Sequence, residues 1–74
     1  YIMKKIKKIK IKINGKFSMI NENLTLSAFL KQLKIPLKKI AIELNREIID
    51  KNKTNKIKLK SNDKIEIVHF IGGG

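Results

Sequence analysis

Residues 9–20 read IKIKINGKFSMI, and this stretch decides the fold that we expect for the chain. Isoleucine and lysine alternate strictly over residues 9–13, which is the period of a strand with one buried face. Asn14-Gly15 follows at once, and both residue types tolerate the positive φ angles of a type I′ turn. Residues 16–20 then supply a partner strand. The sequence therefore predicts an antiparallel hairpin.

The apolar period changes after the hairpin, where we expect a helix. Four apolar residues recur at the spacing i, i+3, i+4 and i+7 that marks one face of a helix, namely Leu26, Phe29, Leu30 and Leu33. Thr25 or Ser27 can cap the start of this helix. Ile35-Pro36 is expected to end it, because the residue before a proline is pushed out of the helical region. A helix of about eight to ten residues depends on docking its apolar face against a sheet.

The second half of the chain predicts further strands. Residues 40–44 alternate in polarity and turn at Asn45-Arg46 into a short run at Ile48-Ile49. Residues 50–55 carry no periodic apolar signal and are expected to form a surface loop. The remaining expected elements are a brief strand at Ile57 and Leu59, a turn at residues 61–63 and a last strand at residues 64–71. This order predicts an α+β fold in one domain, residues 1–74, with a flexible glycine tail at residues 72–74.

The net charge of +12 raises the possibility of a basic nucleic-acid-binding module. Seventeen of the eighteen basic residues are lysine, whereas proteins that read the grooves of DNA rely on arginine for bidentate contacts. Aromatic side chains suited to base stacking are scarce, at 5% of the chain. We therefore expect no nucleic-acid partner and attribute the lysine excess to a biased coding composition.

The side chains offer little for catalysis. The sequence has no cysteine, and His69 is its one histidine, so neither a metal site of ordinary composition nor a convincing catalytic triad is expected. No apolar run approaches the roughly 20 residues that cross a bilayer, and the lysine-rich start lacks the apolar segment of a secretion signal. We expect a cytoplasmic protein without membrane contact, or a stromal one if the gene is organellar.

The glycine ending is the remaining candidate for chemistry. A carboxylate on Gly74 is ionised at neutral pH, and Gly72 and Gly73 lack the Cβ atoms that would bar it from a narrow channel. Val68 and Phe70 alternate with the buried residues of the last strand, so we expect both to be partly exposed beside the tail. An exposed apolar pair at this place suits the docking of a partner protein.

The ending DKIEIVHFIGGG at residues 63–74 resembles that of the ThiS family of sulfur carrier proteins. The turn at Asn14-Gly15, Thr25 before the helix, and the stretch IAIELNREII at residues 40–49 are also similar to that family. The resemblance implies a ubiquitin-like β-grasp fold, with a mixed sheet of four to five strands packed against one main helix. The charge of +12 departs from what we expect of the family.

The resemblance further implies a carrier that is a substrate of other enzymes. An adenylating enzyme that uses ATP and Mg²⁺ would activate the carboxylate of Gly74, and sulfur derived from cysteine would convert it to a thiocarboxylate. Thiazole synthase would then take the sulfur. In this scheme Gly72 and Gly73 give access, Val68, Phe70 and Ile71 help to dock partners, and the carrier binds no stable cofactor. A molybdopterin synthase small subunit and a ubiquitin-like protein modifier use the same terminal chemistry and remain alternatives.

Overall fold

The hairpin predicted at the start of the chain is confirmed by the computed structural model, which describes residues 6–70. β1 (Lys8–Ile13) and β2 (Lys16–Asn21) pair in antiparallel register. Asn14 and Gly15 between them have φ angles of 46° and 83°, the two positive values that a type I′ turn needs. The alternation of isoleucine and lysine therefore sets both the hairpin and its buried face.

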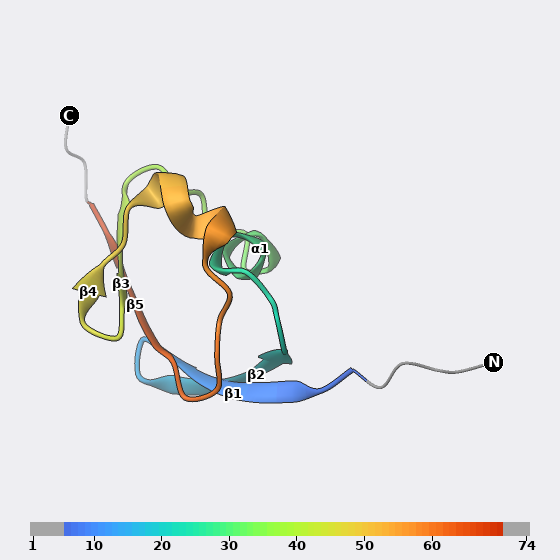
Figure 1. Cartoon of the computed structure of the whole chain (residues 1–74). Coiled ribbons are helices and arrows are strands. Elements are labelled where there is room, and N and C mark those ends of the chain that lie inside the picture. The colour runs from blue at the N-terminus through green and yellow to red at the C-terminus, as the bar shows by residue number, and fades with distance from the viewer. Residues whose placement is uncertain (1–5, 71–74) are drawn as a thin grey trace.

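Three further strands complete a mixed sheet in the order β2-β1-β5-β3-β4 (Figure 1). They are β3 (Ile40–Leu44), β4 (Glu47–Ile48) and β5 (Lys64–His69). β5 runs parallel to β1, whereas the other neighbouring strands are antiparallel. This is the expected β-grasp arrangement with five strands.

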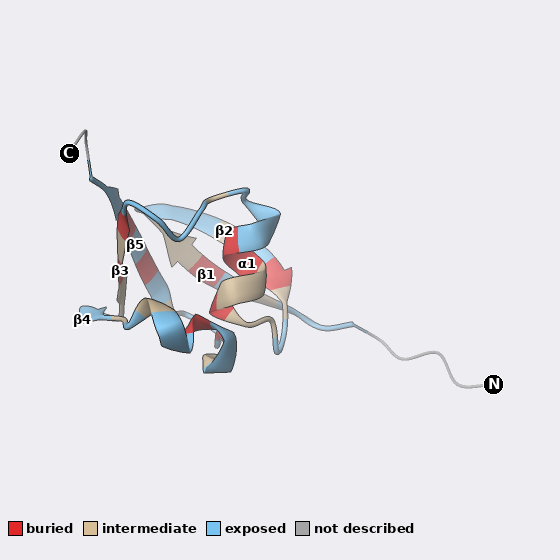
Figure 2. Ribbon diagram, turned by 90° about the horizontal axis from the view of Figure 1, so that it is seen from above, coloured by how far each residue is buried: buried red, intermediate tan, exposed pale blue. Residues whose placement is uncertain are grey.

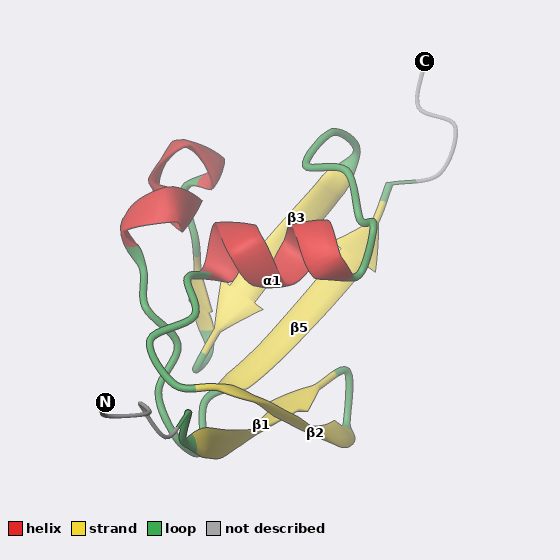
Figure 3. Ribbon diagram, turned by 90° about the vertical axis from the view of Figure 1, so that its right-hand side faces the viewer, coloured by secondary structure: helices red, strands yellow, loops and turns green. Residues whose placement is uncertain are grey.

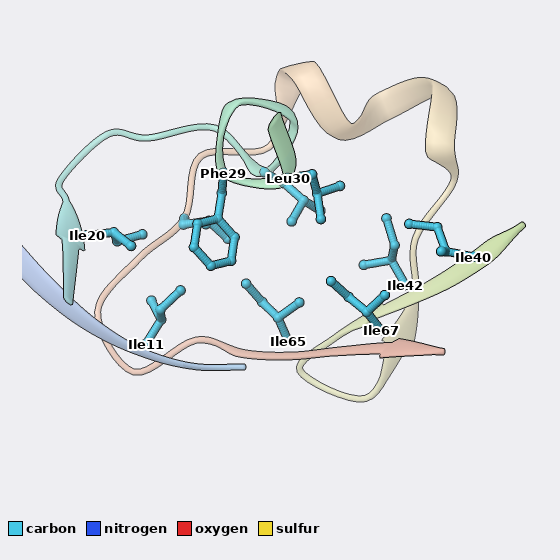
Figure 4. Close-up of a cluster of buried hydrophobic side chains, with 10 residues drawn as sticks. Ile11, Ile20, Phe29, Leu30, Ile40, Ile42, Ile65 and Ile67 are labelled. Carbon is cyan, nitrogen blue, oxygen red and sulfur yellow. The ribbon is translucent and has the colours of Figure 1, made fainter. Parts of the chain in front are cut away.

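One helix, α1 (Leu26–Gln32), lies across the sheet (Figure 3). Thr25 caps it, because its hydroxyl accepts a hydrogen bond from the amide of Ala28 at 3.1 Å. Most of the buried residues lie on the helix and on the facing side of the strands, as Figure 2 shows in red. The core in Figure 4 is almost wholly aliphatic, and its members are Ile11, Ile20, Leu26, Phe29, Leu30, Ile40, Ile42, Leu59, Ile65 and Ile67.

The helix ends earlier than predicted. Gln32 is its last residue, and Leu33, expected on the buried face, is 42% exposed. The cause is a Schellman motif: the amide of Lys34 donates to the carbonyl of Lys31, and the amide of Ile35 donates to the carbonyl of Leu30, both at 3.0 Å. Lys34 adopts a φ of 59° to make this turn, so the chain leaves the helix before Ile35-Pro36 is reached.

Residues 50–55 do not form the surface loop that their polarity indicated. They belong largely to a 3₁₀ helix, η1 (Lys51–Lys56), whose start is capped by the carboxylate of Asp50. Thr54 in this helix is buried at 3% exposure. Its hydroxyl donates to the carbonyl of Lys51 at 3.2 Å, which offsets the cost of burying it.

The prediction of a strand at Ile57 and Leu59 is also wrong. This segment forms one isolated bridge between Lys58 and Thr25. The carbonyl of Ile57 accepts from the amide of Leu26, and the amide of Leu59 donates to the carbonyl of Leu24, both at 2.8 Å. The alternation of apolar residues indicated an extended backbone but did not identify the segment with which it pairs. That segment is residues 24–26, at the start of α1, and not a strand of the sheet.

The cap of α1 gives a direct test of this structure. Thr25→Ala is expected to lower the free energy of unfolding by about 1 kcal/mol, because the amide of Ala28 loses its acceptor. Ser27→Ala is the matched control, since Ser27 lies inside the helix, and it is expected to change stability by only about a few tenths of a kcal/mol. Urea denaturation measures both. Equal losses in the two variants would show that Thr25 does not cap the helix.

Candidate functional site

The predicted tail follows directly from β5, which lies between two other strands. β1 pairs with its beginning at Lys64 and Ile65, and β3 pairs along its length as far as His69. Ile65 and Ile67 point into the core, where both are buried. The backbone that leads to the tail is therefore held by hydrogen bonds on its edges and by packing on one face.

Two asparagines in tight turns fix β5 from opposite sides. The amide of Asn45 donates to the carbonyl of Lys64 at 2.8 Å, and its Oδ1 accepts from the amide of Lys64 at 2.9 Å. On the other side, the amide of Asn14 donates to the carbonyl of Ile65 at 2.9 Å, and its Oδ1 accepts from the amide of Ile67 at 2.8 Å. Each asparagine thus serves both its own turn and the strand beside it.

The predicted exposure of Val68 and Phe70 is confirmed. Val68, inside β5, is 53% exposed, and Phe70, directly after β5, is 55% exposed, although the other face of the strand is buried. Val68 continues the alternation with the buried residues Ile65 and Ile67, so no bulge reverses its direction, whereas at the end of β5 both His69 and Phe70 are exposed. Val68 and Phe70 form an exposed apolar pair at the end of the central strand, and their role in docking stays a prediction.

The last described residue is held in place at the base of the tail. The amide of Phe70 donates to the carbonyl of Lys39 at 2.7 Å, which ties it to the residue before β3. The ammonium nitrogen of Lys51 lies 5.8 Å from the centroid of the Phe70 ring, within the range of a cation–π contact. The other predicted site residues, Ile71, Gly72, Gly73 and Gly74, lie outside the described residues.

Some residues at this site escaped sequence reasoning. Asn14 was assigned to its turn, and nothing in the sequence indicated that its side chain also supports Ile67. The sequence also did not indicate that Lys39 and Lys51 contact Phe70, because both contacts depend on how segments distant in the chain pack together. Lys39 has a positive φ of 63°, which its residue type does not indicate, because positive φ angles are uncommon outside glycine and asparagine.

No second chemical centre emerges from the described part of the chain. His69 is exposed at the end of β5, and residues 6–70 contain no group of three histidine, aspartate or glutamate side chains placed to hold a metal ion. Within the same residues, no helix has the length and apolar character needed to span a bilayer. What these residues supply is a rigid platform that ends in an exposed apolar pair.

Comparison with known proteins points to one family. The model of the ThiS family matches residues 5–74. The sulfur carrier protein ThiS of Bacillus subtilis is 35% identical over 65 residues, which cover 86% of this chain and 98% of that protein. A crystal structure of the thiamine biosynthesis protein ThiS from Geobacter metallireducens superposes with a TM-score of 0.77 at 29% identity, covering 89% of this chain and all of that one.

Larger proteins also contain a segment like this chain. The thiazole synthase of Paramagnetospirillum magneticum is 38% identical over 66 residues, and that of Magnetococcus marinus is 35% identical over 66 residues. The match covers 89% of this chain but 20% of each synthase, so the chain spans about a fifth of the length of these relatives. The similarity therefore concerns one segment of each synthase.

The side chain of Asn14 is open to test. Asn14→Gly keeps a residue suited to the turn but removes the acceptor for the part-buried amide of Ile67, which is expected to cost about 1 kcal/mol of stability. The exchange of the Ile67 amide with solvent should accelerate accordingly. Asn62→Gly is the matched control, because Asn62 has a φ of 71° and its side chain makes no hydrogen bond within residues 6–70. Similar losses in the two variants would contradict the role given to Asn14.

Proposed function

Because the chain belongs to the ThiS family of sulfur carriers in thiamine biosynthesis, we propose that it carries sulfur on the carboxylate of Gly74. A member of this family is a carrier and not itself a catalyst. The observation that carries the proposal is the end of β5, where a firmly held strand presents Val68 and Phe70 to solvent directly before the sequence IGGG. The proposal requires that the mature chain end at Gly74.

The chemistry begins with activation of a poor electrophile. An adenylating enzyme that uses ATP and Mg²⁺ joins the carboxylate to AMP and releases pyrophosphate. A persulfide sulfur that originates from cysteine then displaces AMP, and cleavage of its sulfur–sulfur bond by a thiol leaves a thiocarboxylate. Gly72 and Gly73 let the terminus enter the enzyme, since neither carries a Cβ atom. The folded domain supplies docking energy that offsets the cost of ordering the tail.

Thiazole synthase is the proposed acceptor of the sulfur. Support comes from the relatives named thiazole synthase, which contain a segment similar to this chain within a longer polypeptide. Two functions joined in one polypeptide work at high effective concentration, which suits a donor and an acceptor of the same atom. The relatives named ThiS and thiazole synthase favour the thiazole route over the molybdopterin alternative. The cycle belongs in a compartment with ATP, the cytoplasm or an organelle stroma.

The terminal residue provides the first test of this function. Purified protein incubated with its cognate adenylating enzyme, ATP and a sulfur source is expected to gain about 16 Da, because one carboxylate oxygen is replaced by sulfur. Removal of Gly74 should abolish this gain and leave the stability unchanged, since the residue lies beyond β5. Lys56→Ala, a surface change in η1, is the control and should gain the full mass. A truncated protein that still gains the mass would refute the proposal.

The exposed aromatic beside the tail provides the second test. Phe70→Ala is expected to raise the KM of the adenylating enzyme for the carrier about tenfold, because a buried aromatic anchor is lost from the interface. Phe17→Ala is the matched control: Phe17 is 68% exposed on β2, which β1 separates from β5. ATP–pyrophosphate exchange measures both. An equal effect of the two variants would show that docking does not use the end of β5.

A further inference from the structure

β1 ends before β5 does, which leaves part of the central strand with one neighbour. The two strands are in register only at Lys12 with Lys64 and at Ile13 with Ile65. The chain then turns away at Asn14, whose Oδ1 takes the place of a backbone acceptor for the amide of Ile67. β3 continues to pair on the opposite side as far as His69. Beyond Asn14, β5 therefore has an edge with no strand beside it among the described residues.

The groups on this edge follow from the alternation of hydrogen bonds in a strand. The amide of Phe70 donates toward β3, at the carbonyl of Lys39, so the amides of residues 66 and 68 face the same way. Residues 65, 67 and 69 face the opposite side, in agreement with the bonds of Ile65 and Ile67 to Asn14. The free edge consequently presents the carbonyl of Ile67 and both the amide and the carbonyl of His69.

We propose that this edge, from Ile67 to His69, accepts an extended segment of the adenylating enzyme as an added strand. The inference rests on the proposed function and adds how the enzyme would bind the strand that precedes the tail. Main-chain bonds would supply affinity along the edge, while Val68 and Phe70 offer side-chain contacts on the exposed face of the same strand. A strand added here would hold β5 up to His69, five residues before Gly74.

The positive charge of the chain indicates which kind of enzyme segment would pair with this edge. Lys16 pairs with Ile13 in the hairpin and lies just past the turn at which β1 leaves β5, one strand beyond β1. Lys51, over the ring of Phe70, flanks the tail end of the edge. With a net charge of +12 on the whole chain, an extended segment bearing acidic side chains is the complementary partner. The same charge opposes the pairing of this edge with that of a second copy.

Amide hydrogen exchange of the full chain tests the proposal directly. In the free protein the His69 amide is expected to exchange fast, while the amides of Val68 and Phe70, bonded toward β3, exchange slowly. Saturation with the cognate adenylating enzyme should slow exchange at His69 at least about tenfold. Unchanged exchange at His69 in the complex would overturn the proposal. Slowing that appears without enzyme as protein concentration rises would overturn it in favour of self-pairing.

Two variants separate the backbone of His69 from its side chain. His69→Pro and His69→Ala both lack the imidazole, but only the proline removes the amide donor, so His69→Pro should bind the enzyme about tenfold more weakly than His69→Ala. Equal affinities would overturn the edge proposal. If His69→Pro does not fold by circular dichroism, exchange in the wild-type protein decides.

The acidic character of the partner segment has its own test. Lys16→Glu should weaken binding more than Lys56→Glu, which makes the same charge change in η1; equal weakening would overturn that part of the proposal.

Failure of the proposed function gives a different experimental result from failure of the edge proposal. The former is seen as no gain of mass in the wild-type protein. The latter is seen as a normal gain of mass together with an unprotected His69 amide.

Discussion

The pairing of β5 with β1 is the interaction on which the rest of this structure depends. It joins segments far apart in the chain: the hydrogen bond from the amide of Ile67 to Asn14 spans 53 residues. Such a contact costs loop-closure entropy, which only the burial of the isoleucines around it can offset. Without that pairing, the β1–β2 hairpin and the β3–β4 ribbon would be two separate pieces with exposed apolar faces.

The same arrangement explains how a small protein without catalytic side chains serves as a carrier. The core holds β5 through Ile65 and Ile67, yet Val68 on the same strand and Phe70 directly after it face solvent. The part of the chain that the structure describes therefore ends in a fixed strand with an exposed apolar face. Rigidity on one side of the strand and exposure on the other are two results of a single period-2 pattern.

Sequence reasoning succeeded where a local pattern determines the structure. The alternation in β1, the Asn-Gly turn, the cap at Thr25 and the strand at residues 40–44 are short-range signals, and each is confirmed. The errors fall where a long-range contact or an unusual backbone decides. Lys34 ends α1 in a conformation that glycine usually supplies, and Leu59 pairs with Leu24 rather than with a strand. The hydrogen bond that the Asn14 side chain accepts from the amide of Ile67 was also missed. The turn at Asn14-Gly15 already accounted for an asparagine at this position, so the sequence provided no reason to expect a second role.

The position of β5 in the sheet also bears on how the protein matures on the ribosome. The middle strand of the sheet is the last of the five strands to be synthesised. The hairpin, α1 and the β3–β4 ribbon must wait for residues 64–69 to leave the exit tunnel before a common core can close. A nascent chain therefore lacks the finished surface around Val68 and Phe70, which forms only once the whole domain has folded.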